Sequence, residues 1–238
     1  MKEIFIEYKH GDDILEAYCA YPESVISQKH PLVLISHAWA GRDDFAINTA
    51  RDIANKGYVG FALDLYGKGK IGKTVEEKAA LMMPFMENRS FLHKRLLCNI
   101  EQAKRLDFVD TNNIAVIGFC FGGLCALDLA RIGVNIKGVV SFHGLLSNPG
   151  DISYGDINSK ILVLHGADDP MVSFADVENF SKEMNLHDAD WQINIYSNTK
   201  HGFSVPGAND LKLGVVYNNQ TAKRAWGETY GFLNELFL

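Results

Sequence analysis

The sequence predicts an α/β protein with a mostly parallel sheet, flanking helices and a leading antiparallel hairpin. Short apolar runs rich in β-branched residues, as at 31–36 and 114–119, are typical of strands buried on both faces of a parallel sheet. They alternate with helical segments, and short loops favour right-handed crossovers. The chain has 238 residues, 47% hydrophobic and 22% charged, with no repeat or linker. We therefore expect a single domain over residues 1–238.

The elements follow from residue patterns in chain order. The hairpin comes first, with alternating strands at 4–8 and 15–21 around a glycine-containing turn. A helical region at 75–108 contains Pro84 and the polar stretch 88–90, which are expected to divide it into two helices. The other predicted strands are 31–36, 58–63, 114–119, 136–142, 161–165 and 191–196, and the other predicted helices are 44–56, 122–131, 174–185 and 219–236.

The run Gly118-Phe-Cys-Phe-Gly-Gly123 joins a predicted strand to a predicted helix and places a thiol at the junction. It has the GxSxG pattern of a nucleophile elbow, with sulfur in place of oxygen. The glycines leave room for a strained bend, and a helix N-terminus favours thiolate over thiol at Cys120. A lone pattern of this kind is as typical of a small buried cysteine. The rest of the chain therefore has to distinguish a buried structural cysteine from a catalytic one.

A nucleophile of this type needs an acid and a histidine later in the chain. Asp168 and Asp169 follow the strand at 161–165, and His201 follows the strand at 191–196, so all three lie at the edge where the elbow lies. An Asp-Asp-Pro run is also typical of a simple loop or helix cap. The remaining histidines receive no catalytic role: His187 lies at a polar helix end, His143 and His165 could line the pocket, and His10, His30 and His93 resemble surface residues.

An acyl-transfer site also needs donors for the oxyanion. The backbone N–H of Phe121 directly follows the nucleophile and is the first predicted donor. The second is expected from the small-residue loop at 37–41, at Trp39. That loop is equally compatible with an ordinary tight turn between a strand and a helix.

Charge and cysteine content exclude several classes of function. The net charge of −6 disfavours nucleic-acid and anionic-membrane surfaces. The N-terminal segment begins with strand-like alternation and lacks the pattern of a secretory signal, so a cytoplasmic location is expected. The four cysteines form no metal-ligand spacing and are expected to be free, and we predict neither metal nor cofactor.

With the elbow, the run from His165 to Val172 and the His201-Gly-Phe203 loop in this order, the chain resembles the dienelactone hydrolase family of α/β hydrolases. The Asp64-Leu-Tyr66 tripeptide is also similar to that family. The resemblance implies the α/β-hydrolase fold, no cofactor and a triad of Cys120, Asp169 and His201. It prefers Asp169 to Asp168 because the family's acid lies three residues before the valine, here Val172.

Two positions depart from that family. Ala38 stands where dienelactone hydrolase has a glutamate beside the resting thiol, and Val205 stands where it has an arginine that binds the substrate carboxylate. Arg89 or Arg95 could supply a second such arginine. An anionic dienelactone is therefore not the expected substrate. The apolar stretch at 81–86 is either a pocket wall or helix core, and Ala38, Met83 and Phe203 are predicted to contact the substrate.

The sequence thus predicts a carboxymethylenebutenolidase-like hydrolase of small carboxylic esters or lactones that forms a thioester on Cys120. It is expected to act as a monomer or homodimer on a small molecule. One alternative is a promiscuous aryl esterase that also attacks activated phosphotriesters. Another is a redox-reactive or binding protein on a hydrolase scaffold.

Overall fold

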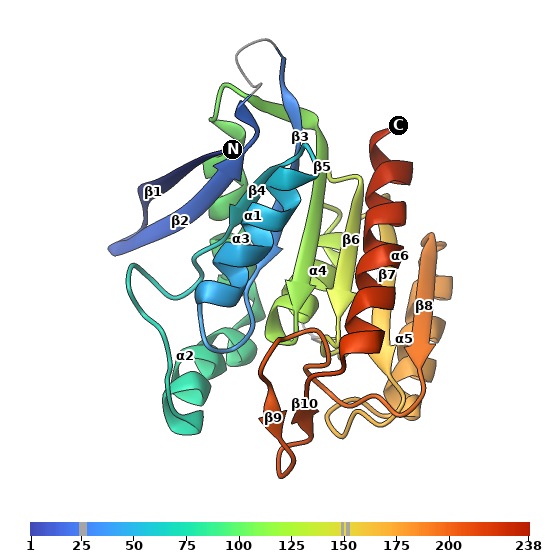
Figure 1. The fold of residues 1–238 in the computed structure, drawn as a ribbon. Helices are drawn as coiled ribbons and strands as arrows, with labels where there is room; N and C mark the ends of the chain where they lie inside the picture. Colours follow the sequence, from blue (N-terminus) through green and yellow to red (C-terminus); the bar gives the residue numbers. More distant parts are fainter. Residues whose placement is uncertain (24–27, 149, 151–152) are drawn as a thin grey trace. The chain divides into compact units, whose positions relative to one another are not determined.

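A computed structural model describes residues 1–23, 28–148, 150 and 153–238. The chain has two compact units, Met1–Val116 and Ile117–Leu238, and strand β5 (Val109–Phe119) runs from the first into the second. The architecture is mixed α/β, with mostly parallel strands, flanking helices and an N-terminal antiparallel hairpin (Figure 1). This confirms the predicted fold class.

In the first unit, strands β1, β2, β4 and β3 lie side by side in that order. β1 (Lys2–His10) and β2 (Asp13–Tyr21) form the predicted hairpin, in register from Lys2 opposite Tyr21 to His10 opposite Asp13. β2 also pairs antiparallel with β4 (Val59–Ala62), and β4 pairs parallel with β3 (His30–Ser36). The hairpin therefore extends the parallel strands on one side.

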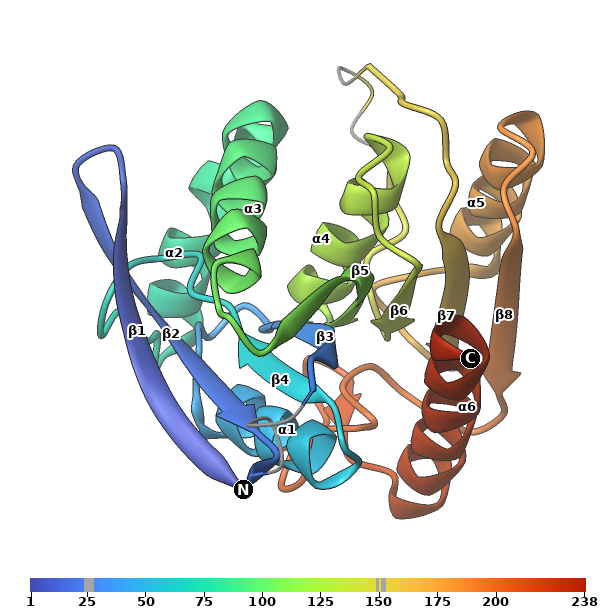
Figure 2. The same cartoon turned by 90° about the horizontal axis from the view of Figure 1, so that it is seen from above.

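In the described part of the first unit, the α-helices are α1 (Asp44–Asn55), α2 (Val75–Glu87) and α3 (Arg89–Lys104). α1 and α3 lie on opposite faces of the unit's strands (Figure 2). The helical region at 75–108 is divided into two helices as predicted, but α2 continues through Pro84, so the expectation that this proline would contribute to the break is wrong. An interior proline removes one backbone donor and crowds the preceding turn, yet α2 ends only three residues later. The break occurs instead at Asn88, whose side chain caps α3 by accepting a hydrogen bond from the Phe91 N–H at 2.9 Å.

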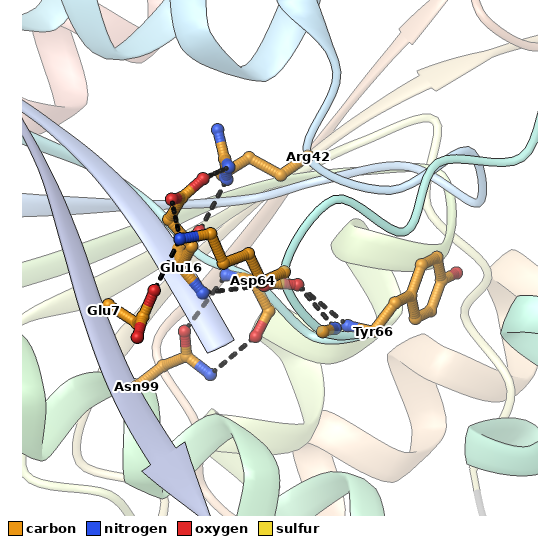
Figure 3. Close-up of polar contacts among 8 residues, drawn as sticks. Glu7, Glu16, Arg42, Asp64, Tyr66 and Asn99 are labelled. Carbon is orange, nitrogen blue, oxygen red and sulfur yellow. Dashed lines mark hydrogen bonds and ion pairs between the residues drawn. The ribbon is translucent and has the colours of Figure 1, made fainter. Parts of the chain in front are cut away.

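The Asp64-Leu-Tyr66 tripeptide forms a buried turn after β4. The Asp64 carboxylate, on a residue that is 3% exposed, accepts hydrogen bonds from the backbone N–H groups of Glu16, Tyr66 and Gly67 at 2.8–3.1 Å. The Asn99 side chain donates to the Asp64 carbonyl at 3.2 Å and accepts from its N–H at 3.1 Å (Figure 3). Because backbone donors satisfy the buried carboxylate, Asp64 holds the turn in one conformation.

Two histidines of this unit differ from their expected surface position. His30 and His93 are only 6% and 8% exposed. His30 begins β3, and its Nδ1 lies 2.9 Å from the Gly57 carbonyl oxygen, where a hydrogen bond forms. His93 is one of the buried residues of α3. Single histidines carry no periodic signal of burial, which explains the error.

The second unit carries three parallel strands, β6 (Gly138–Phe142), β7 (Lys160–Gly166) and β8 (Trp191–Tyr196). Two helices lie on one face of these strands and one on the other (Figures 1 and 2). The pair is α4 (Phe121–Arg131) with α5 (Phe174–Leu186), and the opposite helix is α6 (Asn219–Phe237).

The second unit also has a small hairpin that the sequence pattern did not predict. It consists of β9 (Asn209–Asp210) and β10 (Val215–Val216), each too short to show alternation. In the described part of the chain, no helix combines the length and the apolar character that crossing a bilayer requires.

Candidate active site

Cys120 lies between β5 and α4 with a backbone conformation that is rare for a residue with a side chain. Its φ is 54° and its ψ is −115°, and α4 begins at the next residue, Phe121. The bend brings the strand and helix so close that a Cβ on Gly118 would lie 1.9 Å from the Gly122 carbonyl oxygen. Only glycine fits at 118, as a nucleophile elbow requires. The elbow leaves the thiol half-buried at the N-terminus of α4.

Asp169 and His201 meet in the loops after β7 and β8. The His201 ring donates through Nδ1 to the Asp169 carboxylate at 2.8 Å, and both residues are buried. The other Asp169 oxygen accepts from the Met171 N–H at 2.8 Å, which fixes the carboxylate. Asp168 is exposed, and its N–H donates to the Thr199 carbonyl at 2.9 Å. Of the two adjacent acids, the geometry therefore pairs Asp169 with the histidine.

Electrostatics couple His201 to Cys120. Burial opposes protonation of the ring, but the Cys120 charge and the hydrogen bond to Asp169 outweigh burial and raise the pKa of His201 to about 10. Among the described residues, none holds Nε2 in hydrogen-bond geometry. The Cys120 sulfur nevertheless contributes to the raised pKa of His201 both through its charge and as a hydrogen-bond partner, and such contacts are often loose in resting active sites. The arrangement can hold an imidazolium beside a thiolate.

His143, for which the sequence suggested at most a pocket-lining position and no catalytic role, lies beside His201. It follows β6, its φ is 37°, and its ring meets that of His201 edge-on with centroids 5.0 Å apart. Its Nε2 lies 2.8 Å from the Ser204 hydroxyl. The available signal was positional: His143 follows its strand as Asp169 and His201 follow theirs.

Two further predicted site residues lie in the second unit. Phe121 is the first residue of α4, directly after the elbow cysteine, and its N–H as the first oxyanion donor stays a prediction. Phe203 is completely buried, with ring contacts to Phe142, His143 and Tyr196 at centroid distances of 5.1–6.4 Å. A substrate contact of Phe203 stays a prediction.

Three predicted site residues belong to the first unit. Ala38 and Trp39 are half-buried in the loop after β3, and the Trp39 carbonyl accepts from the Tyr66 hydroxyl at 3.1 Å. Met83 is 42% exposed on α2. Their contacts with substrate, and the Trp39 N–H as second oxyanion donor, stay predictions.

Arg95, considered above for substrate carboxylates, is 1% exposed and already engaged. It donates to the Leu65 carbonyl and to His10 Nδ1, both at 2.9 Å, and pairs with Asp13. Its guanidinium therefore stabilises the Asp64-Leu-Tyr66 turn and the β1–β2 hairpin of its own unit. Within the described ranges, no three histidine, cysteine or acidic side chains are grouped to hold a metal ion.

Comparison with known proteins agrees with this geometry. A sequence model of the dienelactone hydrolase family matches residues 15–237. A crystal structure of a dienelactone hydrolase-like promiscuous phosphotriesterase, P91, from metagenomic libraries is 28% identical, with a TM-score of 0.92 over 100% of this chain and 99% of that one.

Two curated relatives extend the comparison. An uncharacterised protein of Caenorhabditis elegans is 37% identical over 149 residues, which cover 61% of this chain and 94% of that protein. A Bradyrhizobium protein named "Probable 2-oxo-3-(5-oxofuran-2-ylidene)propanoate lactonase" is 25% identical over 228 residues, 91% of this chain and 88% of that protein.

Proposed function

Because the chain belongs to the dienelactone hydrolase family and is therefore a hydrolase of esters or lactones, we propose that it cleaves them through a Cys120–His201–Asp169 triad. The observation that carries this proposal is the 2.8 Å hydrogen bond from His201 to buried Asp169, in the unit whose elbow presents Cys120. A nucleophile, a base and a group that orients the base are the three parts that covalent acyl transfer needs.

The proposed reaction has two halves. The Cys120 thiolate attacks the ester carbonyl, and His201 gives its proton to the departing alkoxide, leaving a thioester on sulfur. His201, now neutral, removes a proton from water as the water attacks the thioester, and the acid product leaves with regeneration of the thiolate. Asp169 keeps the proton on Nδ1, so that Nε2 faces the reacting atoms. The Phe121 N–H stabilises the oxyanion in both halves.

The test compares two cysteines. The Cys120→Ala variant is expected to lose p-nitrophenyl acetate hydrolysis by at least about 1,000-fold, because the nucleophile is gone. Cys98→Ala is the matched control: Cys98 is also partly exposed, but its thiol contacts the Lys9 carbonyl on the hairpin, and full activity is expected. Rapid quenching should trap one acetyl group on Cys120. Full activity of Cys120→Ala would sink the proposal.

A second candidate activity is hydrolysis of activated phosphotriesters, favoured by the 28% identity to a promiscuous phosphotriesterase. A polarisable thiolate accepts phosphorus as well as carbon electrophiles. A diethyl aryl phosphate should then be cleaved by the wild type and not by Cys120→Ala.

A redox role without hydrolysis is the third possibility. In that case Cys120 would react with peroxide while no ester or triester is turned over.

A further inference from the structure

His143 lies between the elbow and His201. On one side, the Phe142 carbonyl accepts a hydrogen bond from the Cys120 N–H at 3.0 Å. On the other, Gly144 packs so closely on the elbow helix that a Cβ there would lie 2.9 Å from the Gly123 Cα. The residues on both sides of His143 are therefore fixed to the elbow. Its positive φ of 37° is a strained conformation that the surroundings must maintain.

The His143 side chain reaches from this fixed point to the His201 loop. Its Nε2 and the Ser204 hydroxyl lie 2.8 Å apart, and both residues are at most 2% exposed. The ring also contacts Phe203 edge-on at a centroid distance of 5.1 Å and His201 at 5.0 Å. Since Ser204 is three residues after His201, this hydrogen bond joins the loop of the base to the backbone that holds the nucleophile.

Besides the hydrogen bond from His201 to Asp169, the His201 loop is held by backbone contacts that do not involve the elbow. The Val216 N–H donates to the His201 carbonyl at 2.9 Å, and the Asn218 N–H donates to the Phe203 carbonyl at 3.0 Å. Both acceptors are carbonyls, so these bonds set the path of the loop. The direction of the imidazole relative to the sulfur depends on the contacts of the ring itself, which are the hydrogen bond to Asp169 and the edge-on contact with His143.

We propose that His143 is a positioning residue. Through its hydrogen bond to Ser204, it holds the His201 imidazole in a fixed orientation relative to the Cys120 sulfur. This inference rests on the proposed roles of Cys120 and His201. His143 acts through His201 and takes no part in bond making.

The charge state of His143 suits this task. Burial, together with the positive charge of His201, holds the pKa of His143 well below its usual range, so the ring is neutral when His201 is protonated. Among the described residues, the other titratable groups around the pair include Cys120, whose charge raises the pKa of His201, Asp169, which balances His201, and His165, whose pKa burial also lowers. A neutral ring can pack against the imidazolium without competing for the thiolate.

The test measures how His201 and Cys120 interact, independently of ester turnover. In a Cys98→Ala background, the rate of Cys120 alkylation by iodoacetamide is followed against pH, with the modified peptide identified by mass. His143→Phe keeps a ring but loses the hydrogen bond, Ser204→Ala removes the partner, and His143→Gln retains a group that reaches the hydroxyl. The double variant His143→Phe with Ser204→Ala completes a cycle.

Both single variants are expected to shift the alkylation midpoint to higher pH and to lower kcat about tenfold with KM changed less than about twofold. The double variant should equal the single ones, and His143→Gln should recover most of the rate. Additive effects, or lower thermal stability with an unchanged midpoint, would overturn the proposal. Retained ester hydrolysis in Cys120→Ala would overturn the proposed function. The alkylation profile would still test whether His143 and Ser204 position His201 beside Cys120.

Discussion

At the residue scale, three histidines that follow or end strands, His143, His165 and His201, differ in their local chemistry. His201 donates to Asp169 and has a raised pKa, whereas burial lowers the pKa of His143 and of His165. Residue type alone does not distinguish them. The distinction comes from the Cys120 charge and the Asp169 hydrogen bond, which raise the pKa of His201. In the described contacts, no carboxylate hydrogen-bonds to the other two rings. This division is consistent with the proposed proton transfer by His201 and the proposed positioning role of His143.

The raised pKa of His201 predicts how stability depends on pH. The folded protein keeps the proton up to a pKa of about 10, whereas the unfolded chain loses it near the ordinary value of 6.5. The folded state therefore binds more protons in this interval, and stability falls as pH rises through it. The stabilisation from His201 is complete below pH 6.5 and is lost as pH passes the folded value.

The measurement is the free energy of unfolding of the wild type and of His201→Gln from pH 6 to pH 11 by urea denaturation. The difference between the two proteins should be largest at the acid end of this range and should shrink as pH rises. His187→Gln is a matched control, since His187 caps α5 and stacks on Tyr154. A difference in unfolding free energy that grows with pH would contradict the raised pKa of His201.

At the scale of elements, the elbow shows why a six-residue motif is identifiable from its residue pattern alone. Gly118 is required by the approach of a strand to the helix that follows it, so the constraint is local and appears in the sequence. The helix boundaries depended on the same kind of local signal. Asn88 caps α3 as its residue type suggests, whereas Pro84 inside α2 misled the prediction because its effect depends on the surroundings of the helix.

The elbow gives a sharp prediction for glycine. Gly118→Ala places a methyl group 1.9 Å from the Gly122 carbonyl oxygen, so strand and helix must separate and the protein should lose several kcal/mol of stability together with its esterase activity. Gly227→Ala is the control, because no atom lies within 4 Å of the added carbon in α6. That change should stabilise the protein by about 0.5–1 kcal/mol.

Both variants are compared with the wild type by thermal unfolding and by p-nitrophenyl acetate hydrolysis. A Gly118→Ala protein with wild-type stability and rate would show that the bend is dispensable. A destabilised Gly227→Ala protein would show that α6 is more crowded on that side than its surroundings indicate.

At the scale of the whole molecule, the net charge, Val205 and the occupied guanidinium of Arg95 favour a neutral substrate. The net charge of −6 repels anions at long range. Val205 stands where the family's clamp arginine would be, and the guanidinium of Arg95 is engaged by Leu65, His10 and Asp13. A substrate carboxylate would therefore enter with little compensation for its lost hydration.

We expect kcat/KM for p-nitrophenyl butyrate to exceed that for the mono-p-nitrophenyl ester of succinate by at least about tenfold, since the two acyl chains are similar in size and differ in charge. Added salt screens the long-range repulsion, so it should reduce the difference in kcat/KM between the two esters by that contribution alone. Equal rates, or a preference for the anionic ester, would show that another cation binds the carboxylate.

The sequence by itself determined the fold class, the elbow and the order of nucleophile, acid and base, because each depends on local periodicity or on residues at strand ends. The family spacing already preferred Asp169 to Asp168, and the tertiary structure pairs Asp169 with His201. Only the tertiary structure decided that Arg95 is occupied and that His143 joins Ser204 beside His201. Those facts depend on where loops from different strands meet, and the same packing leaves Asp168 exposed while it buries Asp169.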